Sequence, residues 1–219
     1  MYNQRAHVKG GGRPSPEGYL FELTGGALCL DFANTVDNRP AQPRELLNTY
    51  DDLVSWAEQA GVLEPKLAPA LRAEAIRRPD AAAAALNGAR ALREAVHGVL
   101  KAAARGAAAP ADSLGMLEAA VAPSLARRRL VQTATGFEWK WTYDDAALDG
   151  LLAPVVESAA ALLTSHDLAR VRECEADTCG WLFLDRSRNR SRRWCDMSVC
   201  GNRAKVRRHY QRTHGKSEV

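Results

Sequence analysis

Apolar positions recur at helical spacing through much of the first three quarters of the chain. Between Asp80 and Gly106 an alanine-rich segment places larger apolar side chains three or four residues apart, which predicts one long helix. The stripe consists of Leu86, Ala89, Leu92, Val96 and Leu100. We expect Asp80 to open this helix, Gly106 to end it and the stripe to face the core.

Three more helices are predicted from the same spacing and from short oxygen-bearing side chains that can accept hydrogen bonds from free amides at a helix start. The first carries Leu53, Trp56 and Ala57 and ends at Gly61, because glycine readily adopts the positive φ of a helix end. The second carries Leu114, Leu117 and Val121, and the third runs from Leu148 to Leu163. Their expected first residues are Thr49 or Asp51, Asp112, and Asp144 or Asp145.

Two segments have the alternation of strands instead. Large or β-branched residues alternate between Arg129 and Tyr143 around Thr135-Gly136, which predicts a β-hairpin. Residues 19–34 form an apolar stretch broken by two glycines, which favours a short strand and a turn. Residues 19–165 are therefore predicted to form a mainly α domain with a small β-hairpin, of the α+β class. Trp56, Trp139 and Trp141 are expected in its core.

Residues 1–18 are polar and glycine-rich, and we expect a flexible leader because they have too little apolar surface to offset the entropy of ordering. The chain has no apolar run of about 18 residues and no hydrophobic signal region at its start. The sequence therefore predicts no membrane partner and a cytoplasmic location.

Candidate chemistry is concentrated at the C-terminal end, where Cys174, Cys179, Cys195 and Cys200 form two C-x4-C pairs. Thiolates at this spacing can close a tetrahedral site around one structural Zn²⁺, which would hold a short segment without a core of its own. Two disulfides are the alternative, but a reducing compartment favours metal. Because four thiolates complete the zinc shell, His209 and His214 are expected to be surface residues.

The cysteine pairs lie in different local settings. Val171 to Cys174 and Gly180 to Leu184 read as two strands of a hairpin, whereas Cys200 precedes a helical stretch that ends near Thr213. Hairpin, metal and helix together predict a treble-clef-like four-cysteine zinc finger over residues 166–219. We expect Trp181 and Trp194 to pack against the metal site rather than stack on bases.

Charge is unevenly distributed along the chain. Residues 174–219 contain 11 Lys and Arg against 5 Asp and Glu, a net +6, although the whole chain is only +4. The candidate phosphate-binding residues are Arg186, Arg188, Arg190, Arg192, Arg193, Arg203, Lys205, Arg207, Arg208 and Arg212. If residues 186–192 are extended, their arginines share one face. In the following helix, Lys205, Arg208 and Arg212 lie opposite a face that is expected to pack.

Guanidinium groups bind phosphate oxygens bidentately, so this cluster suits a polyanion. Contact with about 5 to 7 phosphates of duplex DNA would give a salt slope of roughly −5 to −6. Pairing with carboxylates such as Asp185 and Asp196 is the alternative use of the arginines.

Two motifs resemble a known family. The string from Phe183 to Cys195, followed by Cys200-Gly201-Asn202-Arg203, resembles the CGNR-type zinc finger. Residues 30–37, Leu-Asp-Phe-Ala-Asn-Thr-Val-Asp, are similar to the opening of the ABATE domain, which precedes that finger in a family of stress-induced bacterial transcription regulators. The resemblance implies that all four cysteines bind zinc and that the protein binds DNA to regulate transcription.

A second site is suggested by a dense polar group, namely Asp31, Asn34, Asp37, Asn38 and Arg39. On a helix Asp31, Asn34 and Asn38 would share a face, where they could line a pocket for a small-molecule effector. The alternative is that they brace a helix junction. Because a finger this small has limited specificity alone, a homodimer formed through the helical domain is a further prediction.

Enzymatic activity is not expected. A closed four-thiolate site leaves zinc no open coordination position, and neither a glycine-rich phosphate loop nor a nucleophile elbow is present. A zinc-stapled module that binds an acidic protein or RNA remains the alternative to DNA binding.

Overall fold

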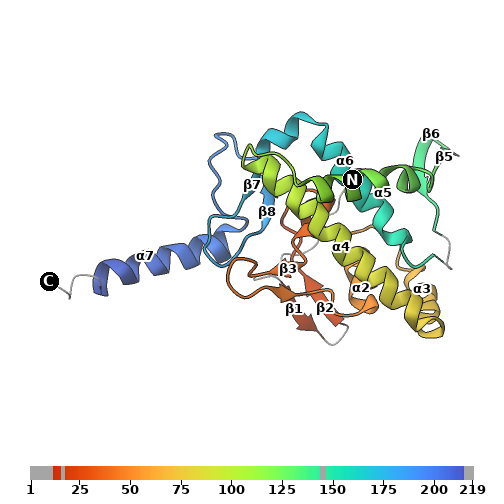
Figure 1. The fold of residues 1–219 in the computed structure, drawn as a ribbon, viewed down its shortest axis with the longest axis horizontal. Helices are drawn as coiled ribbons and strands as arrows, with labels where there is room; N and C mark the ends of the chain where they lie inside the picture. Colours follow the sequence, from red (N-terminus) through yellow and green to blue (C-terminus); the bar gives the residue numbers. More distant parts are fainter. Residues whose placement is uncertain (1–11, 16–17, 144–146, 215–219) are drawn as a thin grey trace.

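A computed structural model describes residues 12–15, 18–143 and 147–214. Helices dominate these residues, and four separate two-stranded antiparallel sheets lie among them (Figure 1). In order the elements before the long helix are β1 (Gly12–Ser15), β2 (Gly18–Phe21), α1 (Leu28–Ala33), β3 (Val36–Asp37), β4 (Arg44–Glu45), α2 (Tyr50–Gln59) and α3 (Ala68–Arg77). The predicted class, mainly α with small β-hairpins, is confirmed.

The long helix α4 (Pro79–Ala104) crosses the middle of the molecule, and α1, α2, α3 and α5 all contact it (Figure 1). All five residues of the predicted stripe are buried. The start differs by one position, because Pro79 takes the first helical turn and Asp80 lies within that turn instead of capping it. Helix α3 was not predicted from the sequence, since Leu71 and Ile76 are its only large apolar residues and it begins without a capping side chain.

After α4 the chain forms α5 (Ala111–Leu125), the hairpin β5 (Arg128–Thr133) and β6 (Gly136–Trp141), the short helix η1 (Gly150–Leu152) and α6 (Ala153–Leu163). The predicted hairpin is confirmed, but its turn is Ala134-Thr135, one position before the predicted Thr135-Gly136, because Gly136 pairs with Thr133. Helix α6 begins at Ala153, later than predicted, and the expected caps Asp144 and Asp145 lie outside the described residues. Helix α5 likewise begins at Ala111, with Asp112 in its first turn and not at its cap.

Helix α2 shows why a local signal can be reliable. The Thr49 side chain accepts a hydrogen bond from the Asp52 amide, and the Asp52 carboxylate accepts one from the Thr49 amide at 2.7 Å. This reciprocal capping satisfies amides that the first helical turn leaves free. The helix ends at Gln59, and Gly61 follows with φ of 71°.

Two expectations about exposed and buried segments are wrong. Gly12–Ser15, assigned to the flexible leader, pairs as β1 with β2. Trp56 is fully buried as expected, but Trp139 is 57% exposed, because β5 and β6 pair only with each other. Alternation along a two-stranded sheet identifies its two faces and cannot tell whether another layer covers either of them.

The C-terminal part comprises η2 (His166–Arg170), β7 (Val171–Glu173), β8 (Leu182–Leu184), the short helical turn η3 (Met197–Gly201) and α7 (Asn202–His214). The hairpin of β7 and β8 lies against α4 and α1, whereas α7 extends away from the rest of the molecule (Figure 1). Val171, Leu182 and Leu184 belong to the same buried cluster as the helices. The finger hairpin therefore shares the core of the helical part.

Candidate metal centre and basic surface

The first cysteine pair lies on the loop between β7 and β8. The Cys174 amide donates to the Trp181 carbonyl at 2.8 Å, and the Cys179 amide donates to Ala176 at 3.0 Å, so the loop is held as a tight turn. Gly180 completes the turn with φ of 71°, and a Cβ there would lie 3.0 Å from the Cβ of Arg39. Glycine is required at this position by both the backbone conformation and the close approach.

The second pair is held by the segment that follows the arginine-rich loop. The Glu175 amide donates to the Arg193 carbonyl at 2.9 Å, which places this segment beside the first turn. The Asp196 carboxylate then accepts from the amides of Ser198 and Val199, at 2.6 and 3.0 Å, and so opens η3. Cys200 lies in η3, which leads directly into α7, so its sulfur is held at the start of that helix.

All four sulfur atoms lie within 4.8 Å of one another, and the four cysteines are buried. The Sγ atoms of Cys179 and Cys195 are 3.6 Å apart, and those of Cys195 and Cys200 are 3.7 Å apart. A tetrahedral Zn²⁺ with bonds of about 2.3 Å requires sulfur separations of about 3.8 Å, whereas a disulfide requires about 2.05 Å. All four are free thiols and fit one structural zinc ion, so the disulfide alternative is wrong.

The packing of the thiols also explains why they need a cation. Hydrogen bonds from Cys179, Cys195 and Cys200 lower the pKa of the Cys174 thiol, while contacts with its neighbours raise the pKa of Cys179 and Cys195. Ionising one sulfur thus opposes ionising the next. A divalent ion removes this penalty by pairing with all four thiolates, so zinc binding also supplies folding free energy.

A second buried cluster, separate from that of the helices, surrounds the sulfurs and contains Trp181 and Phe183. Trp181, just before β8, and Phe183 within it alternate with Leu182 and Leu184, which face the helical core. One strand therefore has the metal on one face and the helices on the other. Trp181 is 2% exposed and donates its indole N–H to the Val36 carbonyl at 3.0 Å, which confirms the predicted packing role.

The arginine-rich loop is not extended, so the condition under which its arginines would share one face is not met. Residues 187–190 form a turn, and Arg190 has φ of 49°. The carboxylate of Asp185, fully buried, accepts hydrogen bonds from the amides of Ser187 and Arg192 at 2.9 and 3.0 Å. Burial raises the pKa of this carboxyl, but the hydrogen bonds lower the pKa by a larger amount. The net pKa therefore lies below its ordinary value. Asp185 therefore organises the loop instead of neutralising its arginines.

The basic residues fall into groups with different surroundings. Arg193 pairs with Glu175, and Arg207 pairs with Asp177, so these two acids neutralise part of the cluster. Arg192 lies 4.6 Å above the ring of Phe183 and donates to the carbonyls of Trp194 and Cys195. Apart from Arg192, six cations of this cluster have no carboxylate partner among the described residues, namely Arg186, Arg188, Arg190, Arg203, Lys205 and Arg208. Of Arg212 only the backbone is described.

The expected packing face of the last helix is exposed. Val206 is 69% and Tyr210 is 62% exposed, because α7 contacts chiefly η3. His209 is also exposed, and the four cysteines are the one group of three or more clustered metal-binding side chains in the described part of the chain. The helix thus presents cationic and apolar side chains together.

The five predicted pocket residues are engaged in separate contacts. Asn34 is 2% exposed, donates to the Leu182 carbonyl and accepts from the Leu182 amide, both at 2.9 Å. Asp31 accepts from the Gly25 amide at 2.7 Å. Asp37 accepts from Arg44, and Asn38 donates to the Gln42 carbonyl. These contacts fit the alternative that the residues brace a junction, and the pocket stays a prediction.

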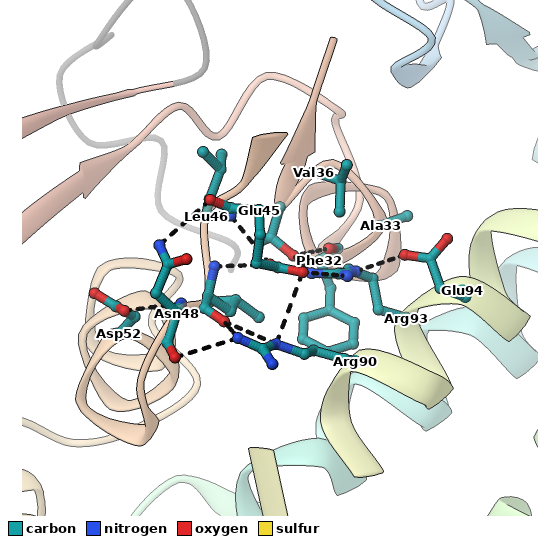
Figure 2. A network of polar contacts seen from close by, with 12 residues as sticks. Phe32, Ala33, Val36, Glu45, Leu46, Asn48, Asp52, Arg90, Arg93 and Glu94 are labelled. Carbon is teal, nitrogen blue, oxygen red and sulfur yellow. Dashed lines mark hydrogen bonds and ion pairs between the residues drawn. The ribbon is translucent and has the colours of Figure 1, made fainter. Parts of the chain in front are cut away.

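The polar network extends into α4, which sequence reasoning missed. The buried Arg93 guanidinium binds both oxygens of Glu45 at 2.6 and 2.7 Å and also donates to Glu94 (Figure 2). Arg39 binds Glu94 at 2.7 Å and the Ala33 carbonyl at 2.9 Å. These bonds fix the segment from α1 to β4 on α4, beside the turn at Gly180. No short motif indicates such a network, because its members are far apart in sequence.

His97 on α4 lies at the same junction, with its Nε2 atom 3.3 Å from the Gly180 carbonyl. Burial and the nearby Arg39 charge lower the pKa of His97 to about 4. The ring is therefore neutral at physiological pH. A protonated ring would place a second positive charge beside Arg39.

A helical body whose core includes the hairpin of a four-thiolate zinc finger defines a zinc-finger protein with an N-terminal helical domain. Comparison with family models assigns both parts. Residues 26–166 match the ABATE family, described as "Putative stress-induced transcription regulator", and residues 170–213 match the CGNR zinc finger. The chain belongs to the ABATE family and carries its zinc finger C-terminal to that domain. No curated protein matches the chain. None of the helices in the described ranges is long and apolar enough to cross a membrane.

Proposed function

We propose that this protein is a DNA-binding transcription regulator and that its zinc finger contacts the phosphate backbone. The observation that supports this function best is the set of six exposed cations without a carboxylate partner, defined above. Four of them, Arg186, Arg188, Arg190 and Arg203, flank the metal site in sequence on either side of Cys195. Zinc fixes the two segments to each other, so a polyanion would meet an array that is ordered before binding.

The surroundings of each cation refine its expected role. Arg192 is engaged by two carbonyls and an aromatic ring, so it stabilises the finger and is not expected to contact DNA. With about six phosphates neutralised, log K should fall with log salt at a slope of about −5. Contacts of this kind position the protein without reading base sequence. Any base readout would come from α7, whose exposed face also carries apolar side chains suited to thymine methyl groups.

Catalysis is not part of this proposal. Four thiolates fill the coordination shell of zinc, which leaves no position for a substrate or an activated water. The buried Cys29 is a poor nucleophile, because desolvation raises the pKa of its thiol to about 12. We also propose a reducing, cytoplasmic setting, since five free cysteines persist there.

The test is fluorescence anisotropy with labelled duplex DNA over a range of salt concentrations. Replacing Arg188 and Arg190 with alanine should weaken binding to all duplexes about equally and make the salt slope shallower by about 2. The matched control is Arg129→Ala with Lys140→Ala, which removes the same charge from the β5–β6 hairpin. An equal loss in the control, or no loss in the finger variant, would contradict the proposal.

The alternatives are distinguished in the same experiment. Binding of single-stranded or duplex RNA in preference to DNA would support an RNA-binding module. If the protein binds no nucleic acid at any salt concentration, an acidic protein would be the remaining candidate partner. Metal removal by a chelator should abolish DNA binding, and addition of Zn²⁺ should restore it.

A further inference from the structure

A groove of about 630 Å³ lies where the helical body meets the arginine-rich loop. Its walls come from the start of α1, the turn after α2, helix α6, the end of β6 and the loop after β8. The apolar lining includes Leu28, Val62, Trp141, Pro154 and Ala161. This volume is in the range of pockets that hold small organic ligands. The predicted pocket at Asp31 to Arg39 is a different place, and none of those residues lines the groove.

The groove has one uncompensated charge. Its two charged lining residues are Glu157 and Arg186. Glu157 is neutralised by Arg128, whose guanidinium also lies 5.4 Å from the centre of the Trp141 ring. Arg186 donates one N–H to the Gly26 carbonyl at 3.1 Å and has no carboxylate partner among the described residues. Its remaining N–H groups are available to an anion.

A second polar group lies on the α6 wall. The Ser158 hydroxyl oxygen accepts from the Cys29 amide at 3.1 Å, and the hydroxyl is also hydrogen-bonded to the Cys29 thiol. The lining therefore offers one available cation, Arg186, among apolar surfaces. A nucleic acid strand requires several cations along its track, whereas one guanidinium matches a single carboxylate.

We propose that this groove binds an organic acid, with its carboxylate on Arg186 and its apolar or aromatic part against Trp141 and Ala161. The regulatory meaning of this site rests on the proposed function, since Arg186 begins the loop that carries Arg188 and Arg190. An acid bound at Arg186 removes one cation from the DNA-binding set. Ligand binding to the helical body is thereby coupled to the finger.

The direct test uses phenylacetate as the probe and phenylacetamide as its neutral match, with isothermal titration of the zinc-loaded full chain and no DNA. Phenylacetate should bind at least about tenfold more tightly than the amide, because a charged hydrogen bond replaces a neutral one. Arg186→Gln should abolish this preference. Arg188→Gln, which removes the same charge from the same loop outside the groove, should retain it.

A second variant keeps the test independent of Arg186. Ala161→Phe should fill the apolar wall and weaken both probes while zinc content and the helical circular dichroism stay unchanged. Absence of phenylacetate binding at millimolar concentration, or a preference lost in Arg188→Gln and kept in Arg186→Gln, would overturn the site. Because these titrations contain no DNA, their failure is separate from a failure of DNA binding.

The coupling has its own readout in the anisotropy experiment. Saturating phenylacetate should make the salt slope for DNA shallower by about 0.9, the contribution of one phosphate contact. The Arg186→Gln protein should already have this shallower slope and should not respond to phenylacetate. An unchanged slope in the unmodified protein would overturn the shared use of Arg186.

Discussion

Single residues in this protein perform tasks that their chemical type alone does not disclose. Asp185 and Asp196 are both carboxylates within a basic segment, where ion pairing with arginine is the simplest expectation. Their oxygens accept backbone amides, and each orders a turn in the finger. The acids that do pair with arginines, Glu175 and Asp177, lie in the turn between Cys174 and Cys179.

A prediction at the residue scale concerns His97. Its pKa is about 4 in the folded protein and about 6.5 in an unfolded chain, so the unfolded state binds more protons between these values. The contribution of His97 to stability is therefore complete above about pH 6.5 and declines as pH falls toward 4. The expected loss is on the order of 3 kcal/mol.

The measurement is denaturant unfolding of the protein and of His97→Gln at several pH values. The difference in unfolding free energy between them should shrink from pH 7 to pH 4, because the variant lacks this titration. Acid also protonates the zinc ligands in both proteins, and the subtraction removes that shared effect. A difference that is constant with pH would show that His97 does not titrate as described.

At the scale of elements, β8 joins two structures that depend on different forces. Its Leu182 and Leu184 side chains are buried with the helices, while Trp181 and Phe183 enclose the thiolates. Removing zinc should disrupt the packing of Trp181 and Phe183 around the thiolates and leave the packing of Leu182 and Leu184 against the helices in place. We therefore expect the part held only by metal to be the segment after β8, and not the entire finger.

Hydrogen exchange of the chelated protein tests this expectation. Amides from about residue 193 to 201 should lose protection, whereas the amides of Leu182 and Leu184, which donate to Asn34 and Gly25, should keep much of theirs. Cys195→Ser should reproduce the effect of the chelator. The control is Cys29→Ser, at a buried cysteine outside the metal site, which should keep zinc and the protection of the amides after Cys174. Equal loss of protection in the two variants would contradict the view that the metal site holds this segment.

At the scale of the whole molecule, the helical body and the finger form one folded unit. Asn34 connects them most directly, since its amide group pairs with both backbone groups of Leu182 in a buried position. Asn34→Ala would leave a buried N–H and a buried carbonyl without partners. The expected destabilisation is about 3 kcal/mol, from two groups at about 1–3 kcal/mol each.

The control for this variant is Asn87→Ala, an exposed position on α4 where the change should stay within about 0.5 kcal/mol. Both proteins would be unfolded with denaturant while monitoring helix and zinc release. In Asn34→Ala we expect both signals to shift together, because the junction serves both parts. Separate transitions in the unmodified protein would contradict the view that body and finger share one core.

The sequence by itself determined the features that depend on neighbouring residues. The stripe of α4, the start of α2 near Thr49, the β5–β6 hairpin and the four zinc ligands all follow from spacing or from side chains within a few positions. Tertiary structure decided what packs against what, which depends on residues distant in the chain. It left Trp139 and Val206 exposed, joined Asn34 to Leu182, and placed Arg186 beside Gly26. The physical reason is that spacing fixes which face a residue occupies, whereas burial, pairing and the free charge on an arginine are set by surfaces that meet only when the chain has folded.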